Sequence, residues 1–120
     1  MKPRLNLWIE RNGDVVMSAW RIRLLEAIAV SGSISAAALE MDIPYRLAWE
    51  RIHEMEKRLK LTLVDTAIGG AGGGGANLTD VARDLIYRFH TFTDGLDVEV
   101  ETRYKKAFIG FSLGGKPVTE

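Results

Sequence analysis

The side chains with the most chemistry to offer gather in a short stretch near residue 45. Tyr45, Arg46 and Trp49 place a phenol, a guanidinium and an indole close together, and Glu50 and Arg51 follow directly. A guanidinium can donate two parallel hydrogen bonds to a base edge or a phosphate, and aromatic rings pack against sugars and bases. This chemistry is recognition by hydrogen bonding and stacking, with no covalent step.

Other chemistries find little support in the sequence. The chain has no cysteine, which excludes disulfides and thiolate metal sites. His53 and His90 lie far apart without partners at metal-ligand spacing, so we expect two ordinary histidines. No Ser-His-acid or Cys-His set and no paired carboxylates in an apolar cleft are readable. The sequence therefore predicts a protein that is not an enzyme and has no cofactor and no metal.

Composition indicates one globular domain of 120 residues, 47% of them apolar. No apolar run approaches the length of a membrane span, and the N-terminus lacks the apolar core of a signal peptide, so a cytoplasmic protein is expected. The 16 basic and 16 acidic residues cancel. Their distribution is uneven, because residues 43–60 carry five Lys or Arg against three Glu. A basic middle segment favours an anionic partner.

The first elements are predicted to be a hairpin and a helix. Asn12-Gly13 is a strong turn signal between the alternating strands of a hairpin over about 5–17. Ser18 can cap a helix over 18–30, which Gly32 ends. In this helix Arg21 and Arg23 are expected to face away from the apolar stripe.

Two further helices follow the first. Ser33 can cap a short helix over 34–41, and Pro44 suits the first position of a third helix over 44–59. Its apolar stripe is Ala48, Ile52, Met55 and Leu59. Three helices in this order, the second short and joined to the third by a tight turn, predict a helix-turn-helix.

Residues 69–76 read GGAGGGGA and hold half of the twelve glycines. A phosphate-binding loop is disfavoured, since no lysine follows the run. A flexible linker and the tip of a β-hairpin remain. Because a strand pattern over 61–68 precedes the run and a short return strand at 76–78 follows it, the helix-turn-helix context favours a hairpin, the wing of a winged helix.

The last predicted element is a long helix over about 80–105, capped by Thr79. Its stripe is nearly a heptad seam, made of Val81, Leu85, Phe89, Phe92, Leu96 and Val100. Packing on another subunit and folding back over its own domain both fit, and the length favours a homodimer. Gly95 costs about 1 kcal/mol inside a helix and marks a place for a kink or break. Residues 106–120 form a tail with no usable periodicity.

Five segments together resemble the N-terminal domain of the ModE-type molybdate-responsive bacterial transcription regulators. They are Leu24–Ile28 (LLEAI), Gly32–Ala38 (GSISAAA), Tyr45–Glu50 (YRLAWE), Gly69–Ala76 (GGAGGGGA) and Leu78-Thr79. The alanine core and the late Leu-Thr are also similar to LysR-type DNA-binding domains. The resemblance covers about residues 18–90 and implies a winged helix-turn-helix, a homodimer and operator binding in the major groove of DNA.

Two departures from the family qualify what the resemblance implies. Family wings commonly carry basic residues, whereas here Ala71 interrupts the glycines and Thr66-Ala67-Ile68 precede them. Each lost phosphate contact should flatten the salt dependence of DNA binding by a log–log slope of about 0.9. The family continues into molybdate-binding domains that lie beyond residue 120, so we expect no molybdate site in this chain.

The sequence thus predicts a mainly α fold with small β-hairpins, a winged helix-turn-helix with a long C-terminal dimerisation helix. Residues 1–105 form the DNA-binding domain, with dimerisation through about 79–105, and the predicted function is a sequence-specific, dimeric regulator of transcription that binds double-stranded DNA. The alternative is a protein-interaction module that pairs with another regulator and binds DNA weakly or not at all. The predicted dimer interface is Val81, Leu85, Phe89, Phe92 and Leu96.

The residues predicted to touch DNA come from the start of the second helix, the third helix and the wing. They are Ser33, Ser35, Pro44, Tyr45, Arg46, Trp49, Glu50, Arg51, Gly72, Gly73 and Gly74. Arg46 is the expected base reader, since an arginine on guanine is the commonest specific contact. Simpler roles compete at several positions: capping for the serines, packing for Tyr45 and Trp49, and ion pairs with Glu54 for Arg51 and Arg58.

Overall fold

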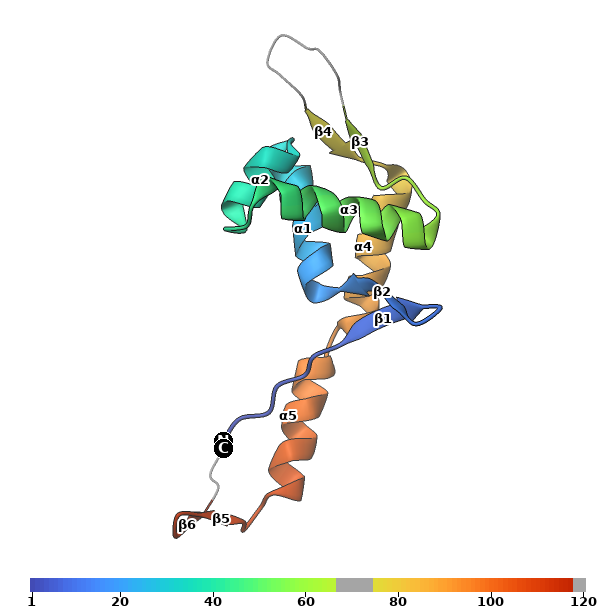
Figure 1. Ribbon diagram of the computed structural model, residues 1–120. Helices are drawn as coiled ribbons and strands as arrows, with labels where there is room; N and C mark the ends of the chain where they lie inside the picture. Colours follow the sequence, from blue (N-terminus) through green and yellow to red (C-terminus); the bar gives the residue numbers. More distant parts are fainter. Residues whose placement is uncertain (67–74, 118–120) are drawn as a thin grey trace. The chain divides into compact units, whose positions relative to one another are not determined.

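The structure is a computed structural model, and it describes residues 1–66 and 75–117. The chain divides into two compact units, Leu7–His90 and Met1–Asn6 together with Thr91–Glu120. The candidate site lies in the Leu7–His90 unit, which contains two hairpins and a group of packed helices (Figure 1). The predicted domain end at residue 105 stays a prediction.

The first element is the hairpin that the Asn-Gly signal predicts. Strand β1 (Trp8–Arg11) pairs antiparallel with β2 (Asp14–Ser18). Both turn residues have positive φ, 54° at Asn12 and 83° at Gly13. This is the conformation that Asn-Gly adopts most readily in two-residue turns. The hairpin is confirmed, with strands shorter than the pattern over 5–17 indicates.

The three helices of the helix-turn-helix lie within one residue of their predicted bounds. They are α1 (Ala19–Ser31), α2 (Ile34–Glu40) and α3 (Tyr45–Leu59). Pro44 is the residue before α3 rather than its first position, with ψ at 143°. Its fixed φ still suits the entry into a helix, and no side-chain hydrogen bond caps α3 there.

Helix boundaries follow from capping chemistry. The Ser18 hydroxyl accepts a hydrogen bond from the Arg21 amide at 3.2 Å, and the Ser33 hydroxyl accepts one from the Ala36 amide at 3.0 Å. Each bond satisfies an amide that has no partner inside its helix. Helix α1 ends at Gly32, whose φ of 78° is left-handed and suits glycine.

The main core lies between α1, α2, α3 and the wing strands. Small residues on α2 and α3 let these helices approach α1 closely, since Ala37, Ala38 and Ala48 are almost completely buried. Fully burying a large aliphatic side chain is worth about 1.5–3 kcal/mol. The large side chains buried completely are Ile22, Leu24, Leu25, Ile28, Ile52, Met55 and Leu63.

The predicted wing strands are present on both sides of the glycine run. Strand β3 (Val64–Thr66) pairs antiparallel with β4 (Ala76–Leu78). The return strand has the predicted bounds. Residues 67–74, which include most of the glycine run, lie outside the described residues.

Side chains from neighbouring helices fix the base of the wing. The Glu56 carboxylate accepts hydrogen bonds from the amides of Leu63 and Val64 at 2.8 and 3.2 Å. The Thr79 hydroxyl donates to the Thr62 carbonyl at 2.7 Å and accepts from the Ala82 amide, so Thr79 caps the next helix as predicted. The wing therefore begins from a rigid base.

The C-terminal helical stretch is divided in two. Helix α4 (Asp80–Thr93) is followed by α5 (Leu96–Ala107), and Gly95 between them has a φ of 79°. The two helices together cover the predicted 80–105 except for residues 94 and 95, and the break falls at Gly95, where the low helix propensity of glycine predicted it. In the tail, β5 (Ser112–Leu113) pairs with β6 (Lys116–Pro117), a hairpin that the sequence analysis did not predict.

Arg21 is buried, contrary to the expectation from its spacing in α1. It was expected to face away from the apolar stripe of α1, but it is only 9% exposed and its Nη2 donates to Glu54 Oε1 at 2.6 Å. The reason is the carboxylate on α3, which is 33 residues away in sequence and is invisible to the spacing within α1. Arg23 is exposed as predicted.

Glu54 is the centre of a network of arginines. Arg58 and Arg51 pair with it at 3.0 and 3.4 Å, and Arg58 also donates to the Val15 carbonyl at 2.7 Å. Burial acts to raise the pKa of Glu54, but the hydrogen bond from Arg21 and the charges of the three arginines outweigh it. The pKa therefore lies below its ordinary value of 4.5. The network joins α1, α3 and β2.

Glu54→Gln should lower the free energy of unfolding by about 1–3 kcal/mol near neutral pH, because Arg21 stays buried without its anionic partner. A carboxylate with a depressed folded pKa stabilises fully above its unfolded pKa, and that stabilisation is lost as the pH falls through the folded pKa. The difference between the parent and the variant should therefore shrink in acid. Urea denaturation near neutral pH and below the ordinary value of 4.5 measures both effects.

The matched control is Glu99→Gln in α5, which breaks an exposed pair with Arg103 at 2.8 Å. Exposed pairs of this kind contribute about 0.3–0.5 kcal/mol. Equal losses in the two variants would contradict the role assigned to Glu54.

Candidate nucleic-acid interface

Helix α3 has one face anchored in the core and one face exposed. Ala48, Ile52 and Met55 are buried as their spacing predicts. On the opposite face Tyr45 is half-exposed and Trp49 is 44% exposed, so Trp49 does not pack into the core. The buried stripe fixes the direction in which the exposed side chains point.

Arg46 is the most accessible charged group at the start of α3. Its side chain is 89% exposed, and its Nε donates to Glu50 Oε1 at 2.9 Å. An exposed pair four residues apart contributes only about 0.3–0.5 kcal/mol, so Arg46 can exchange this partner at little cost. The guanidinium retains two terminal amino groups that match paired acceptors such as guanine O6 and N7.

Trp49 and His53 form a stacked pair one turn along the same side of α3. Their ring centroids lie 3.7 Å apart with an interplanar angle of 22°. His53 Nδ1 lies 2.8 Å from the Trp49 carbonyl oxygen. The stack holds a flat aromatic surface beside Arg46, which suits contact with sugars and the edges of bases.

Arg51 and Arg58 take the ion-pair role that competed with phosphate contact. Both pair with Glu54, and Arg51 is partly exposed. Arg51 therefore reaches outward only from the edge of the Glu54 network. Its predicted contact with DNA stays a prediction.

The start of α2, the start of α3 and the base of the wing meet around a shallow pocket of about 140 Å³. It brings together Ser33, Ser35 and Tyr45 with Gly75 and Ala76. The Ser33 hydroxyl is occupied as the cap of α2. Three segments predicted to touch one partner thus share one surface.

A backbone hydrogen bond ties the wing to this surface. The Ala76 amide donates to the Gly32 carbonyl at 2.7 Å, which joins β4 to the turn between α1 and α2. The predicted contacts of Gly72, Gly73 and Gly74 lie outside the described residues. The base of the wing is nevertheless held beside Tyr45 and the start of α2.

The residues of the predicted dimer seam divide between two environments, the core of their own unit and the exposed surface. Phe89 is only 4% exposed and packs with Val16, Met17 and Ile22 in a second core cluster, and Leu85 is half-buried against the same residues. Packing within its own unit therefore occupies Phe89. Val81 and Phe92, by contrast, expose a substantial part of their apolar surface, and Leu96 is half-buried.

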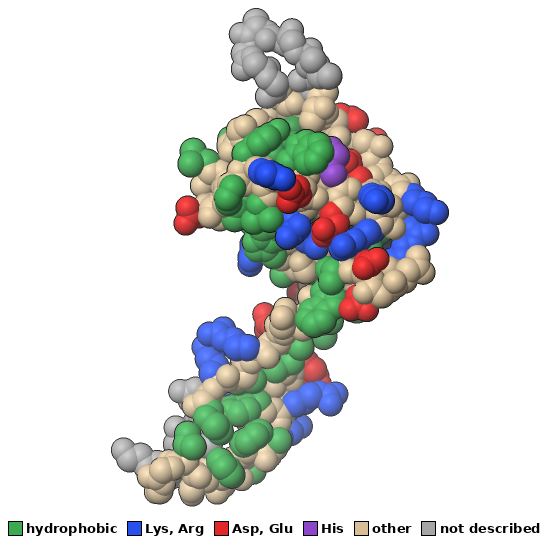
Figure 2. Space-filling model, viewed as in Figure 1, with side chains coloured by type: hydrophobic (Ala, Val, Ile, Leu, Met, Phe, Trp, Pro, Cys, Tyr) green, Lys and Arg blue, Asp and Glu red, His purple; other side chains and the backbone are tan. Residues whose placement is uncertain are grey.

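Sequence reasoning missed a groove of about 660 Å³ between the β1–β2 turn and α3. Its lining includes Arg11, Asn12, His53, Lys57 and Lys60. Figure 2 shows basic and acidic side chains interleaved over α3 on the visible face of this unit. The sequence places Arg11 far from Lys57, and the available signals near the groove were the Asn-Gly turn and the basic excess over residues 43–60.

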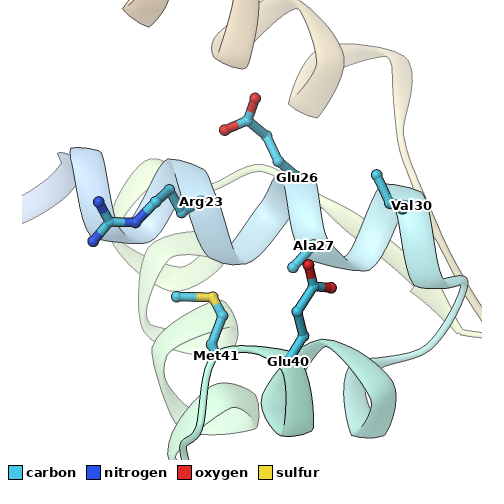
Figure 3. Close-up of a pocket in the computed structure, with 6 residues that line it drawn as sticks. All are labelled: Arg23, Glu26, Ala27, Val30, Glu40 and Met41. Carbon is cyan, nitrogen blue, oxygen red and sulfur yellow. The ribbon is translucent and has the colours of Figure 1, made fainter.

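A separate face of the same unit contains a shallow pocket of about 290 Å³ between α1 and the end of α2. Figure 3 shows Arg23, Glu26 and Val30 on α1, with Glu40 and Met41 at the end of α2. None of the residues predicted to touch DNA lines this pocket.

In the part of the chain that the structure describes, the His, Asp and Glu side chains form no group of three or more that could hold a metal ion. No helix among residues 1–66 and 75–117 is long and apolar enough to cross a membrane.

Comparison with known families matches one continuous region that includes the helices of the helix-turn-helix and the base of the wing. Residues 20–83 match the family model of the bacterial regulatory helix-turn-helix proteins, lysR family. The chain is 50% identical over 86 residues to the DNA-binding transcriptional dual regulator ModE of Escherichia coli K12, which covers 72% of this chain and 33% of that protein. It is 41% identical over 88 residues to the molybdenum-pterin-binding protein MopB of Rhodobacter capsulatus, covering 73% and 32%.

The chain spans about a third of the length of the curated relatives it matches. The predicted absence of a molybdate site stays a prediction.

Solved structures show the same fold. The CbnR DNA-binding domain in complex with DNA aligns with a TM-score of 0.56 at 18% identity, covering 76% of this chain and 98% of that one. The BenM DNA-binding domain in complex with benA site 1 DNA aligns with a TM-score of 0.55 at 18% identity, covering 76% and 97%. The predicted winged helix-turn-helix and the resemblance to ModE-type domains are confirmed.

Proposed function

We propose that this protein is a dimeric, sequence-specific regulator of transcription. The premise is that the chain belongs to the lysR family of bacterial regulatory helix-turn-helix proteins. Its ligand is double-stranded DNA, and α3 enters the major groove. The observation that carries the proposal is the exposed side of α3, where Arg46 and the Trp49–His53 stack project from a helix anchored in the core. The family relationship to DNA-binding regulators supports it.

Arg46 reads a base in this proposal, and Tyr45 and Trp49 contact the sugar-phosphate backbone on either side. Recognition helices contact base edges from their N-terminal residues, and Arg46 is the second residue of α3. Pro44, Glu50 and Arg51 border the same surface. Glu50 bonds to the Arg46 guanidinium before DNA binds, which lowers the entropy cost of ordering it.

The second contact region is the shared pocket at the base of the wing. Ser33 and Ser35 lie at the start of α2, and Tyr45 lies beside them at the start of α3. We assign this surface to phosphates next to the major groove. Contact of the wing glycines Gly72, Gly73 and Gly74 with DNA stays a prediction. Phosphate contacts position a protein on DNA, and base contacts specify the sequence.

Arg46→Ala should remove sequence preference and leave weak, salt-dependent binding. Losing one bidentate base contact costs about 1–3 kcal/mol, which corresponds to roughly a 5- to 150-fold loss on the preferred duplex. Fluorescence anisotropy with a duplex selected from a randomised library, beside a scrambled duplex, measures the ratio of the two affinities. Binding to the scrambled duplex should change much less.

Arg88→Ala is the matched control, because Arg88 forms a similar exposed pair with Asp84 at 2.8 Å on α4. It should leave the ratio of affinities unchanged. A parent protein with no preference between duplexes would instead favour the protein-interaction module as the function of this fold.

The homodimer is the second part of the proposal. Val81 and Phe92 expose apolar surface along α4, and Phe92 is 54% exposed. Apolar side chains at near-heptad spacing on an exposed helix are typical of helix–helix association. Phe89 contributes to the core of its own unit, so the proposed interface uses the other members of the predicted seam, Val81, Leu85, Phe92 and Leu96.

Phe92→Ala should weaken self-association by about tenfold or more, because it removes an aromatic ring from the interface. Sedimentation velocity over a concentration series measures the dissociation constant. Val30→Ala, a substitution of an exposed apolar residue on α1, is the control and should have no effect. A parent protein that stays monomeric throughout the series would refute the dimer.

A further inference from the structure

The β1–β2 hairpin precedes the region that the family model matches, which begins at residue 20. It is tied to the end of α3 by reciprocal arginine-to-carbonyl hydrogen bonds. Arg11 Nη1 donates to the carbonyls of Arg58 and Leu59 at 3.3 and 3.0 Å, and Arg58 Nη1 donates to the Val15 carbonyl at 2.7 Å. The hairpin and the last turns of α3 therefore form one rigid surface.

This surface encloses the groove of about 660 Å³ and is rich in uncompensated positive charge. Glu54 is neutralised by its arginines, and Glu50 pairs with Arg46. Arg11 bonds only to neutral carbonyls, and Lys57 and Lys60 make no hydrogen bond or ion pair through their side chains within the described part of the chain. Three cations thus face one remaining acid of the groove, Asp14. This excess of positive charge in the groove favours an anionic ligand.

The length of α3 indicates which anion reaches the groove. Its 15 residues span about 22 Å at about 1.5 Å per residue, whereas the major groove of DNA is about 12 Å wide. When the first turns occupy the groove, the last turns extend beyond its width, towards a flanking strand. Trp49, His53 and Lys57 are four residues apart in turn, so they follow one side of the helix from Arg46 towards the β1–β2 turn.

We propose that the groove between the β1–β2 turn and the C-terminal half of α3 binds a phosphodiester of the DNA backbone, beside the major groove that Arg46 reads. This inference rests on the proposed function. Arg11, Lys57 and Lys60 supply the positive charge, and the Asn12 side chain at the exposed turn supplies an amide donor. The hairpin acts as a second wing at the opposite end of α3 from the start of α2.

The test is the salt dependence of DNA binding by the full chain with Lys57→Gln and Lys60→Gln combined. Both side chains are exposed, so the fold should be unaffected, and circular dichroism checks this. Each lost phosphate contact lowers the log–log salt slope by about 0.9, so the double variant should lower it by about 1.8 if both contacts are made. Affinity should fall by a similar factor on the selected and scrambled duplexes, because phosphates carry no sequence information.

The matched control is Arg23→Gln with Arg83→Gln. It removes the same charge from two exposed positions that line pockets on the separate α1 face (Figure 3 shows Arg23). The control should keep the parent slope. The inference is overturned if the Lys57/Lys60 variant keeps the salt slope of the parent protein, or if the control variant lowers that slope by the same amount. Either result leaves the role of Arg46 intact. A parent protein without salt-dependent binding overturns the proposed function and this inference with it.

Discussion

The Glu54 carboxylate accepts hydrogen bonds from arginines on two helices, and the placement of α3 depends on this junction. Arg21 reaches it from α1, and Arg58 reaches it from α3 while also bonding to the carbonyl of Val15 in β2. The consecutive elements β2 and α1 thus meet the distant α3 around one partly buried anion. Removing charge from water is costly, so such a cluster persists only where opposite charges and hydrogen bonds surround it, as they do here.

The arrangement around α3 separates support from recognition. Apolar side chains and the Glu54 network hold the inner side of α3 in place, so the exposed side takes no part in this packing. Arg46 and Trp49 contribute little to the core, so their identity can follow the ligand rather than the fold. The bond between Ala76 and Gly32 extends this support to the wing, whose base cannot shift without moving the start of α2.

Much of the fold was predictable because local chemistry determines it. Ser18, Ser33 and Gly32 set helix boundaries within one residue, and Asn12-Gly13 set the first turn. The buried position of Arg21 was not predictable, because its partner lies on another helix.

Other features were not predicted, for different reasons. The Gly114-Gly115 pair formed a turn with positive φ at both residues, in a tail where no strand pattern was visible. Within the candidate site, Tyr45, Arg46 and Trp49 stood out by residue type. The basic groove did not, because Arg11 and Lys57 come together only through the packing of the hairpin on α3.

The second core cluster has a consequence for what counts as the domain. Val16 and Met17 of β2 pack against Ile22 and Phe89, so the hairpin supplies half of the buried members of that cluster. A fragment cut at residue 20, where the family-model match begins, would expose Ile22 and Phe89 to water and remove two groups that bond to the end of α3, the Arg11 side chain and the Val15 carbonyl. The packed unit of this chain therefore extends beyond the region that the family model matches, because its second core cluster needs the hairpin.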